Sequence, residues 1–412
     1  MAAVTLEKLD RFYRDPVPVP SHIPPELVVD FDYVRAADEG ENPFESFTAI
    51  MKRDDIPRLF WTPRQGGHWV ALNFEDYIEI CRDTDNFTTY PVGISGTPIS
   101  PNRIIPLEID PPEHMKYRKI LGPLFTPKEI LKLDPIIRAA AIELIEGFAA
   151  NGRCNFVDEF SRQMPTKLFL TLMGMPVEKL PEFLHWEHQI FSGIPDEANK
   201  GRASIAAYIR EFMAEKRNNP GNDITTVLFD ARPDGEPLSD QEIFDTCFML
   251  FIAGLDTVPN TFAFTWRYLA QNDAARRYLH DPANIPDAAE EIMRLNSVVN
   301  MTRRPRHDMD FHGVKLAYGD IVVLPCAIVN RDPTQFPDPD SVVLDRESNR
   351  HVAFGAGPHR CLGSHLARYE LNIALEEWLK RIPEFRLKPG YRPDARGGGT
   401  MGLLDLHLEW DV

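Results

Sequence analysis

The spacing of apolar residues divides the chain into regions of different structure. From about residue 113 to residue 295, apolar residues recur every three or four positions, which predicts helices. The longest uninterrupted pattern covers 239–271, and Ser239 with Glu242 three residues later is a capping-box sequence that begins a helix. We expect this helix to be central. A last long helix is predicted over 363–381.

Short strand patterns lie on either side of the helical region. Residues 58–73 predict two strands joined at Gln65-Gly66-Gly67, and residues 74–83 predict a helix. Residues 309–325 again predict short strands, and the proline-rich stretch 330–348 predicts an irregular meander. Residues 86–110 hold several prolines and glycines, which is typical of a lid, a binding loop or a disordered segment.

These patterns together predict a mainly α-helical fold with a minor β region. Hydrophobic residues make up 43% of the chain and charged residues 26%, which is typical of a globular protein rather than a disordered one. We expect a single domain over 1–412. The proline-rich segment 1–45 should pack on that domain as extended chain.

The charge balance narrows the possible partners. Lysine and arginine number 45 against 62 aspartates and glutamates, so the formal net charge is −17. This acidity argues against nucleic acid and against an anionic membrane surface as the partner. No secretory signal is visible at the N-terminus, and the apolar run 247–255 is too short to span a membrane. The five cysteines are odd in number and scattered, which indicates neither a disulfide framework nor a zinc finger, so we expect a reducing cytoplasm. We also expect the protein to be a monomer.

One cysteine has an unusual setting. Cys361 lies in "FGAGPHRCLG", where a glycine-rich loop leads into the helix predicted from 363. The free N–H groups and the dipole at a helix N-terminus favour a thiolate there. A single thiolate cannot form a structural zinc site, but it can serve as the axial ligand of a haem. The simpler alternative is a free cysteine buried at a turn, and the motif alone leaves both possibilities open.

A second motif interrupts the central helix. In "FIAGLDTVPN", Asp256 and Thr257 are polar residues within an otherwise apolar run. Burial of a carboxylate is costly unless the group is paired, and Pro259 cannot donate to the carbonyl of Leu255. We therefore predict a break in the helix that makes room for a small ligand or a water. The alternative is a packing kink in which Thr257 bonds back to its own helix.

Two weaker signals are pairs on helix faces. Glu291 and Arg294 are three residues apart, as are many ordinary ion pairs, and His114 and Arg118 are four apart. The glycine run at 397–399 lacks the lysine and the helix of a phosphate loop, so we interpret it as a turn.

Taken together, these motifs resemble the cytochrome P450 family of haem-thiolate monooxygenases over nearly the whole chain. The matching stretches are "FGAGPHRCLG", "AGLDT", "EEIMR", "HMKYR" and "NRDPTQFPDPD", in the family's order. Among bacterial members the chain is most similar to the camphor-hydroxylating branch, through stretches such as "GGHWVA" and "AGLDTV". The resemblance implies a triangular, helix-rich prism with haem b between the central helix and the cysteine loop.

The resemblance also implies a role for each matching residue. Cys361 would be the axial thiolate and iron ligand, and Asp256 and Thr257 would relay protons to dioxygen. Glu291 and Arg294 would hold the meander behind the haem. The haem propionates would be bound by His114, Arg118, Arg303 and His359.

The matching implies a largely aliphatic substrate pocket with few polar atoms, suited to a compact apolar ligand. We expect an oxygenated monoterpenoid such as camphor or cineole, or a norisoprenoid such as ionone, with Asn102 donating to the ligand's oxygen. The lining residues would be Gly93, Asn102, Ile104, Leu107, Met249, Ile252, Ala253, Val299, Met301 and Thr400.

The chain departs from the family pattern in three places. Ser341 stands where the meander arginine is expected, and Asn102 stands where the camphor enzyme has a tyrosine. Leu184, His188 and Ser192 replace a charged cluster coupled to the aspartate, so the proton route should differ.

Electrons should come from a separate protein, because no flavin or iron–sulfur motif accompanies the haem domain. We expect a two-iron ferredoxin with its reductase to bind a basic face around the haem loop that includes Arg118, Arg360 and Arg368. That face would also hold Lys116, Lys119 and Arg350. The alternatives to a monooxygenase are a haem-thiolate sensor or electron-transfer protein without turnover, and a peroxide-driven relative. The acid–alcohol pair argues against both.

Overall fold

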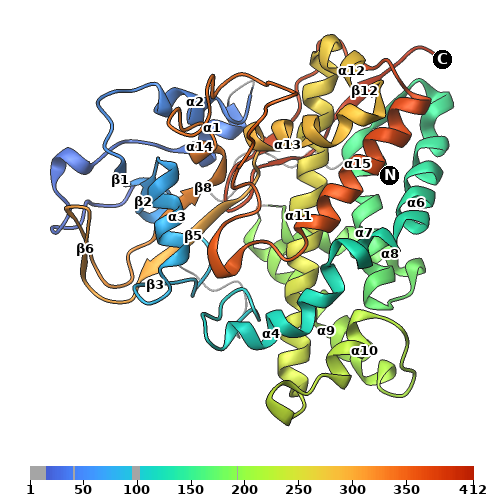
Figure 1. Ribbon diagram of the computed structural model, residues 1–412, viewed down its shortest axis with the longest axis horizontal. Helices are drawn as coiled ribbons and strands as arrows, with labels where there is room; N and C mark the ends of the chain where they lie inside the picture. The colour runs from blue at the N-terminus through green and yellow to red at the C-terminus, as the bar shows by residue number, and fades with distance from the viewer. Residues whose placement is uncertain (1–14, 40–41, 95–102, 193) are drawn as a thin grey trace.

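The computed structural model describes residues 15–39, 42–94, 103–192 and 194–412. Helices dominate one side of the molecule and short strands the other, with the long helix α11 (Asp240–Gln271) running between them (Figure 1). The other helices are α1 Tyr33–Glu39, α2 Glu45–Met51, α3 Phe74–Arg82, α4 His114–Leu121, α5 Pro127–Leu131, α6 Asp134–Phe148, α7 Gln163–Met173, α8 Leu180–Ile190, α9 Pro195–Lys216, α10 Ile224–Asp230, α12 Asp273–Tyr278, α13 Ile285–Leu295, α14 Cys326–Val329 and α15 Ser364–Arg381. This arrangement confirms the prediction of a mainly α-helical fold with a minor β region.

The strands form one five-stranded sheet and three small ones. The large sheet has the order β1-β2-β8-β5-β3, in which only β2 and β8 run parallel. The small sheets pair β10 with β11, β6 with β7, and β12 with both β4 and β9. The strands are β1 Leu59–Thr62, β2 His68–Ala71, β3 Phe87–Thr88, β4 Arg153–Asn155, β5 Asn300–Pro305, β6 Met309–Phe311, β7 Val314–Leu316, β8 Val322–Pro325, β9 Arg386–Leu387, β10 Ala395–Arg396, β11 Gly402–Leu403 and β12 His407–Glu409.

The hairpin predicted over 58–73 is confirmed as β1 and β2. Gln65, Gly66 and Gly67 all have positive φ in the turn, and Trp61 pairs with Trp69 across the strands. The extended N-terminal chain lies against this hairpin, where Val17 and Val29 donate backbone hydrogen bonds to β1 and the turn after it. The part of the proline-rich segment that the structure describes therefore packs on the domain.

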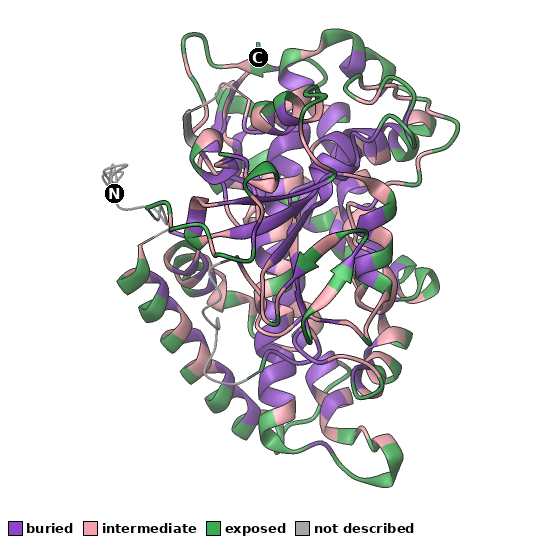
Figure 2. Cartoon of the chain, turned by 90° about the vertical axis from the view of Figure 1, so that its left-hand side faces the viewer, coloured by how far each residue is buried: buried purple, intermediate pink, exposed green. Residues whose placement is uncertain are grey.

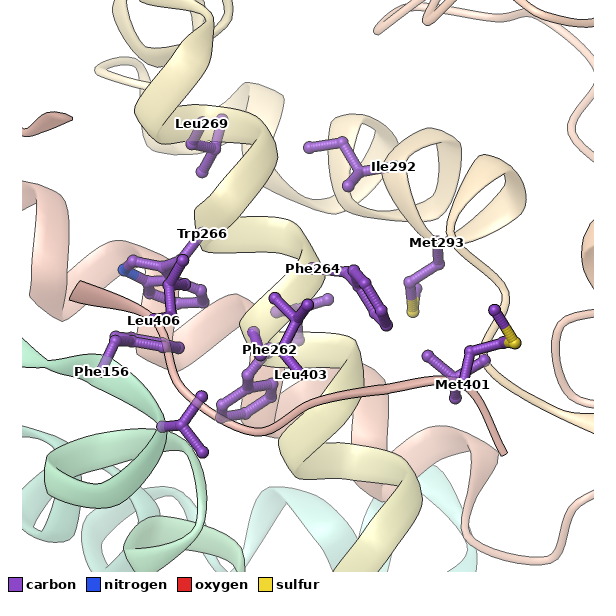
Figure 3. Packing of buried hydrophobic residues seen from close by; sticks show 14 of the residues in the cluster. Phe156, Phe262, Phe264, Trp266, Leu269, Ile292, Met293, Met401, Leu403 and Leu406 are labelled. Carbon is purple, nitrogen blue, oxygen red and sulfur yellow. The ribbon is translucent and has the colours of Figure 1, made fainter. Parts of the chain in front are cut away.

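Helix α11 is held at the centre of the core by aromatic packing. Ser239 caps it with the reciprocal hydrogen bonds of a capping box to Glu242, as the sequence predicts. Trp266 is fully buried and stacks on Phe156 with 4.7 Å between ring centroids. Figure 3 shows Trp266, Phe262 and Phe264 of this helix facing side chains from α13 and the C-terminal strands. Burial of each such ring contributes about 1.5–3 kcal/mol.

Burial explains why this long apolar helix does not behave as a membrane span. By length and composition α11 could cross a bilayer, yet 61% of its most apolar window is buried inside the protein. Buried residues concentrate along the middle of the molecule, with exposed ones on the outer helix faces (Figure 2). The helix is therefore a core helix of this fold.

Candidate haem and oxygen site

The loop that carries Cys361 has a fixed shape. Gly355 and Gly357 have φ of 73° and 68°, and a Cβ on Gly357 would collide with the carbonyl oxygen of Cys81. Cys361 donates its N–H to Phe354 O at 2.8 Å, which closes the loop three residues before α15 begins. Glycine is thus required where α3 approaches the loop, and the cysteine is held at the start of a helix.

Cys361 is the exposed cysteine of the five, whereas the other four are buried. The surrounding protein raises the pKa of its thiol by desolvation, and the Gly363 N–H with the guanidinium groups of Arg118, Arg360 and Arg368 lowers it. The same N–H and charges would stabilise a thiolate bound to a cation. Its neighbour Leu362 packs against the core cluster that includes Phe251 and Leu255 of α11.

The predicted propionate ligands come together, with donors that lack partners. His114 of α4 and His359 of the haem loop have ring centroids 4.2 Å apart. Buried atoms without a hydrogen-bond partner include His114 Nδ1, His359 Nε2 and Nη2 of Arg303 on β5. Each orphaned buried donor costs about 1–3 kcal/mol, so the cluster suits an anionic ligand. These residues therefore fit the carboxylates of a haem.

Burial keeps these histidines neutral. Desolvation, followed by the proximity of the His359 ring and of the Arg118 guanidinium, lowers the pKa of His114 to about 4. The pKa of His359 is also lowered, by burial first, although Asp110 opposes the shift. Both rings would serve as neutral donors to an anion.

Asp110 is a member of this cluster that the sequence did not reveal. Its Oδ1 lies 3.6 Å from His359 Nε2, and its Oδ2 accepts from Thr88 at 2.5 Å and from Arg306 at 2.6 Å. Desolvation raises the pKa of Asp110, but the nearby His359 ring and the hydrogen bond from Thr88 outweigh it and lower the pKa overall. The carboxylate orients His359. It follows β3 in a loop, where no spacing rule marks it.

The Glu291–Arg294 pair is structural, as expected, but the interpretation of Ser341 was wrong. Arg346, five residues further along the meander, completes the pair by donating to both oxygens of Glu291, at 3.0 and 3.1 Å. Only the carbonyl of Ser341 takes part, accepting from Arg294 at 3.0 Å. Because the meander is irregular, counting positions against the family placed the arginine incorrectly.

The centre of α11 carries the acid and the alcohol. Ala253 is exposed between Phe251 and Leu255, which are fully buried, so this part of the helix presents an uncovered face. Thr257 donates its hydroxyl to Ala253 O at 2.9 Å. The predicted break was wrong, because α11 continues through Pro259 without interruption. Thr257 bonds back to its own helix, as the alternative interpretation had it.

Asp256 belongs to a buried ion cluster. Its Oδ1 accepts from Arg396 of β10 and, at 2.9 Å, from the side-chain amide of Asn260. A small polar cavity beside it is also lined by Glu187 of α8 and by Arg162, which precedes α7. A charged cluster thus accompanies the aspartate, built from other residues than the Leu184, His188 and Ser192 positions. Arg396 and Asp256 are 140 residues apart, and no sequence signal connects them.

The structure shows contacts for part of the proposed substrate-lining set. Val299 forms a bridge with Thr400, and Gly93 donates its N–H to Thr302 Oγ1 at 3.1 Å. Ile104 is buried and Leu107 half-buried, while Met249 and Ile252 belong to α11. The Met301 side chain lies against Gly355 of the haem loop. Asn102 lies outside the residues that the structure describes.

The proposed partner-binding residues differ in how free they are. Arg360 is exposed, and so are Lys119 and Arg350. Arg368 is half-buried and donates two hydrogen bonds to Glu290, at 2.6 and 2.8 Å. Arg118 is half-buried, and Lys116 pairs with Glu242 at 2.6 Å.

Comparison with known proteins agrees with this site. The cytochrome P450 family model matches residues 286–396. A probable cytochrome P450 127A1 of Sinorhizobium fredii is 34% identical over 401 residues, covering 95% of this chain and 97% of the relative. Mycinamicin IV hydroxylase/epoxidase of Micromonospora griseorubida is 32% identical, covering 77% of this chain and 83% of its own.

Solved structures give the same result. The crystal structure of CYP101J2 matches with a TM-score of 0.87 and 35% identity, covering 96% of this chain and all of the other. That of CYP101C1 matches with the same TM-score and 30% identity. With a fitting site, full-length relatives and a shared fold, this chain belongs to the cytochrome P450 family and is a bacterial-type monooxygenase whose cofactor is haem b.

Proposed function

We propose that the enzyme hydroxylates an unactivated C–H bond of a small oxygenated terpenoid, using dioxygen and two electrons from a ferredoxin. The observation that supports turnover, rather than sensing or electron transfer, is the acid–alcohol pair on α11. Asp256 and Thr257 are adjacent, next to the uncovered face at Ala253. A sensor or an electron carrier has no need of a proton donor at that position.

In this proposal the residues around the haem loop hold the cofactor. Cys361 would bind the haem iron through its thiolate, and the unpartnered donors of His114, Arg303 and His359 would hold the propionates together with Arg118. When bound, the haem supplies the activation of dioxygen and the oxidation of the substrate carbon. Asp110 positions His359, and the Glu291–Arg294–Arg346 cluster holds the meander behind the loop.

Asp256 and Thr257 are proposed to deliver the protons. The Thr257 hydroxyl donates to a backbone carbonyl of α11, so one rotation of its side chain would free it to donate elsewhere. Asp256 is held towards Arg396 and would pass protons from the polar cavity towards the haem side of the helix. The Thr257 hydroxyl and the Asp256 carboxylate would transfer these protons beside the exposed residue Ala253 of α11.

The proposed substrate class rests on the aliphatic side chains among the proposed substrate-lining residues. Ile104, Leu107, Ile252 and Val299 offer apolar surface, and Thr400 adds one hydroxyl beside Val299. Such a wall suits a compact ligand with a single oxygen. We keep Asn102 as the proposed donor to that oxygen. Relatives differ in substrate: one is a methyl-branched lipid omega-hydroxylase of Mycobacterium tuberculosis, which makes a branched lipid the competing class.

The redox partner is proposed to be an acidic two-iron ferredoxin, and the setting the cytoplasm. Arg360, Lys119 and Arg350 are exposed and positive, in a chain whose net charge is −17. Arg118 and Arg368 would contribute charge to the same face, with Arg368 tied to Glu290. The four buried cysteines suit a reducing compartment.

An optical titration tests the substrate class. The ferric enzyme would be titrated with camphor, cineole, ionone and a methyl-branched fatty acid, and the shift from low-spin to high-spin iron recorded. We expect a near-complete shift with one terpenoid. A shift with the fatty acid alone would overturn the terpenoid assignment and leave the monooxygenase assignment intact.

Replacing Thr257 by alanine tests its role. Without the hydroxyl, reduced oxygen should leave as peroxide, so product per electron pair should fall about 10-fold or more while oxygen consumption continues. Thr261→Ala is the matched control, because Thr261 also donates to the carbonyl four residues before it, one turn further along α11. Unchanged product yield in Thr257→Ala would remove Thr257 from the mechanism.

A further inference from the structure

Glu187 is a buried carboxyl without a full set of partners, and the functions described above do not use it. It lies on α8, with 2% of its surface exposed. Its Oε1 is 3.2 Å from Arg162 Nε, and its Oε2 has no hydrogen-bond partner. A native structure rarely leaves such a buried oxygen unsatisfied without a functional reason.

A small cavity connects Glu187 to Asp256. It is lined by both carboxyl residues, by Arg162 and Arg396, and by Ser161 and Asn260. The space open to the centre of a water molecule is about 10 Å³, close to the room that one water needs. One water there would reach the free oxygen of Glu187 on one side and Asp256 on the other.

Arg162, which lines the cavity, also contacts side chains at the protein surface. Arg162 Nη1 lies 3.4 Å from Nδ1 of the exposed His188, and 3.6 Å separate Arg162 from Asp158, whose side chain is 59% exposed. Arg162 follows a π-helical turn, Val157–Ser161, a local irregularity that is often found at functional sites. The arginine does not relay protons, because its guanidinium stays charged. Water that enters beside Arg162 would transport the proton instead.

The charges of the cluster favour one proton shared by the two carboxyl groups. Desolvation, together with the smaller effect of the Asp256 charge, raises the pKa of Glu187 to about 8 against the lowering effects of Arg162 and Arg396. Glu187 is therefore protonated at neutral pH, while Asp256 is held by a guanidinium and an amide that both donate to it. If Asp256 takes up a proton, its charge no longer opposes ionisation of Glu187, which makes transfer between the two carboxyls cooperative.

We propose that Glu187 and Asp256 share one proton across this cavity, stored on Glu187 at rest, and that Glu187 resupplies Asp256 during turnover. The Glu187 carboxyl gives its proton to the cavity water, which gives one to the Asp256 carboxylate. Glu187 then takes a proton from solvent through water beside Arg162. This inference rests on the proposed role of Asp256. Glu187 would act through Asp256 by supplying its proton, and would not touch the substrate.

The first test uses Glu187→Gln, with Glu187→Asp for rescue and Glu370→Gln as the matched control. Glu370 on α15 is also buried, and burial alone raises its pKa to about 8, with no contribution from Asp256. We expect Glu187→Gln to slow turnover about 10²-fold and to flatten its pH profile. Glu187→Asp should recover part of the rate, and Glu370→Gln should keep it.

Infrared spectroscopy of the resting holoenzyme gives a readout that is independent of turnover. At pH 6.5 the component of the protonated-carboxyl stretching band that comes from Glu187 should be absent in Glu187→Gln and retained in Glu187→Asp, while the component from Glu370 should be lost only in Glu370→Gln. If Glu187→Gln loses no component of the band or keeps wild-type turnover, or if Glu370→Gln is equally slow, the proposal is overturned. Asp256→Asn separates the two claims: if it is slow while Glu187→Gln is normal, Asp256 keeps its role and Glu187 loses it, and if it is normal, the role of Asp256 fails as well.

Discussion

Two buried ion clusters, one around Glu291 of α13 and one around Asp256 of α11, differ in how completely their polar atoms are hydrogen-bonded. In the meander cluster, Glu291 accepts from Arg294, Arg346, the Val343 N–H and the Asn349 amide, and both members of the Glu291–Arg294 pair are fully buried. In the cluster around Asp256, Glu187 keeps one oxygen without a partner beside a water-sized cavity.

The number of hydrogen bonds that each carboxyl accepts separates a buried charge that holds structure from a buried group that can exchange a proton. Burial alone would raise the pKa of Glu291, but the donors from Arg294, Arg346 and Val343 lower it, so Glu291 stays ionised. The pKa of Glu187 is raised instead. A fully satisfied network resists any change of protonation, whereas a partly satisfied one can gain and lose a proton at little cost.

We expect the greatest loss of unfolding free energy from a substitution in the fully hydrogen-bonded cluster around Glu291. Arg294→Ala would leave the buried Glu291 charge without its main partner and the carbonyls of Asn330 and Pro339 without that donor, which should cost about 3–5 kcal/mol of unfolding free energy. Urea unfolding of the holoenzyme measures this loss. Arg386→Ala is the control, because Arg386 forms an exposed pair with Asp411 and should change stability by less than about 1 kcal/mol. Similar losses in both variants would show that the Glu291 cluster is not special.

We expect a smaller effect, on the rate of reduction by ferredoxin, from a substitution of an exposed arginine. Arg360→Glu reverses an exposed charge close to Cys361 and should slow reduction by ferredoxin on the order of 10-fold at low salt, with weaker salt dependence. Fold stability should change by less than about 0.5 kcal/mol. Stopped-flow reduction at several ionic strengths measures the rate. Arg35→Glu is the control, because Arg35 is an exposed arginine on α1, whereas other arginines such as Arg202 are partly buried. Equal slowing by Arg35→Glu would argue for net charge rather than a docking face.

Much of the fold could be predicted from the sequence because its signals are local. The capping box at Ser239, the glycines of the β1–β2 turn and the glycines before Cys361 each determine structure within a few residues. The residues proposed to hold the haem could be located because they stand in local motifs that the family resemblance matches. His114 and His359 come together although they are far apart in sequence, and the structure confirms that contact.

The remaining site residues could not be predicted because their partners are remote. Arg396 meets Asp256 only through the pairing of β10 and β11 behind α11, and Arg162 meets Glu187 only through the packing of α7 on α8. Arg346 was missed for a different reason: the meander has no regular period from which to count. The predicted break at Pro259 failed because the rest of a 32-residue buried helix outweighs one missing hydrogen bond.

The most direct test of the contrast between the clusters is the pH dependence of stability. Below about pH 4.5 Glu187 is protonated in both the folded and the unfolded chain, and between about 4.5 and 8 only the folded chain holds the proton. Its contribution to stability therefore falls as pH rises through this window, by about 1.4 kcal/mol for each pH unit. Glu291 behaves oppositely, since its lowered pKa gives stability that is present above the unfolded pKa and lost in acid.

We would therefore measure urea unfolding of the wild-type holoenzyme and Glu187→Gln at intervals from pH 5 to pH 8. Glutamine does not titrate, so the account predicts that the stability of the wild type relative to Glu187→Gln declines steadily across that range. A difference that stays constant with pH would mean that Glu187 is ionised in the folded protein, and the stored proton would not exist.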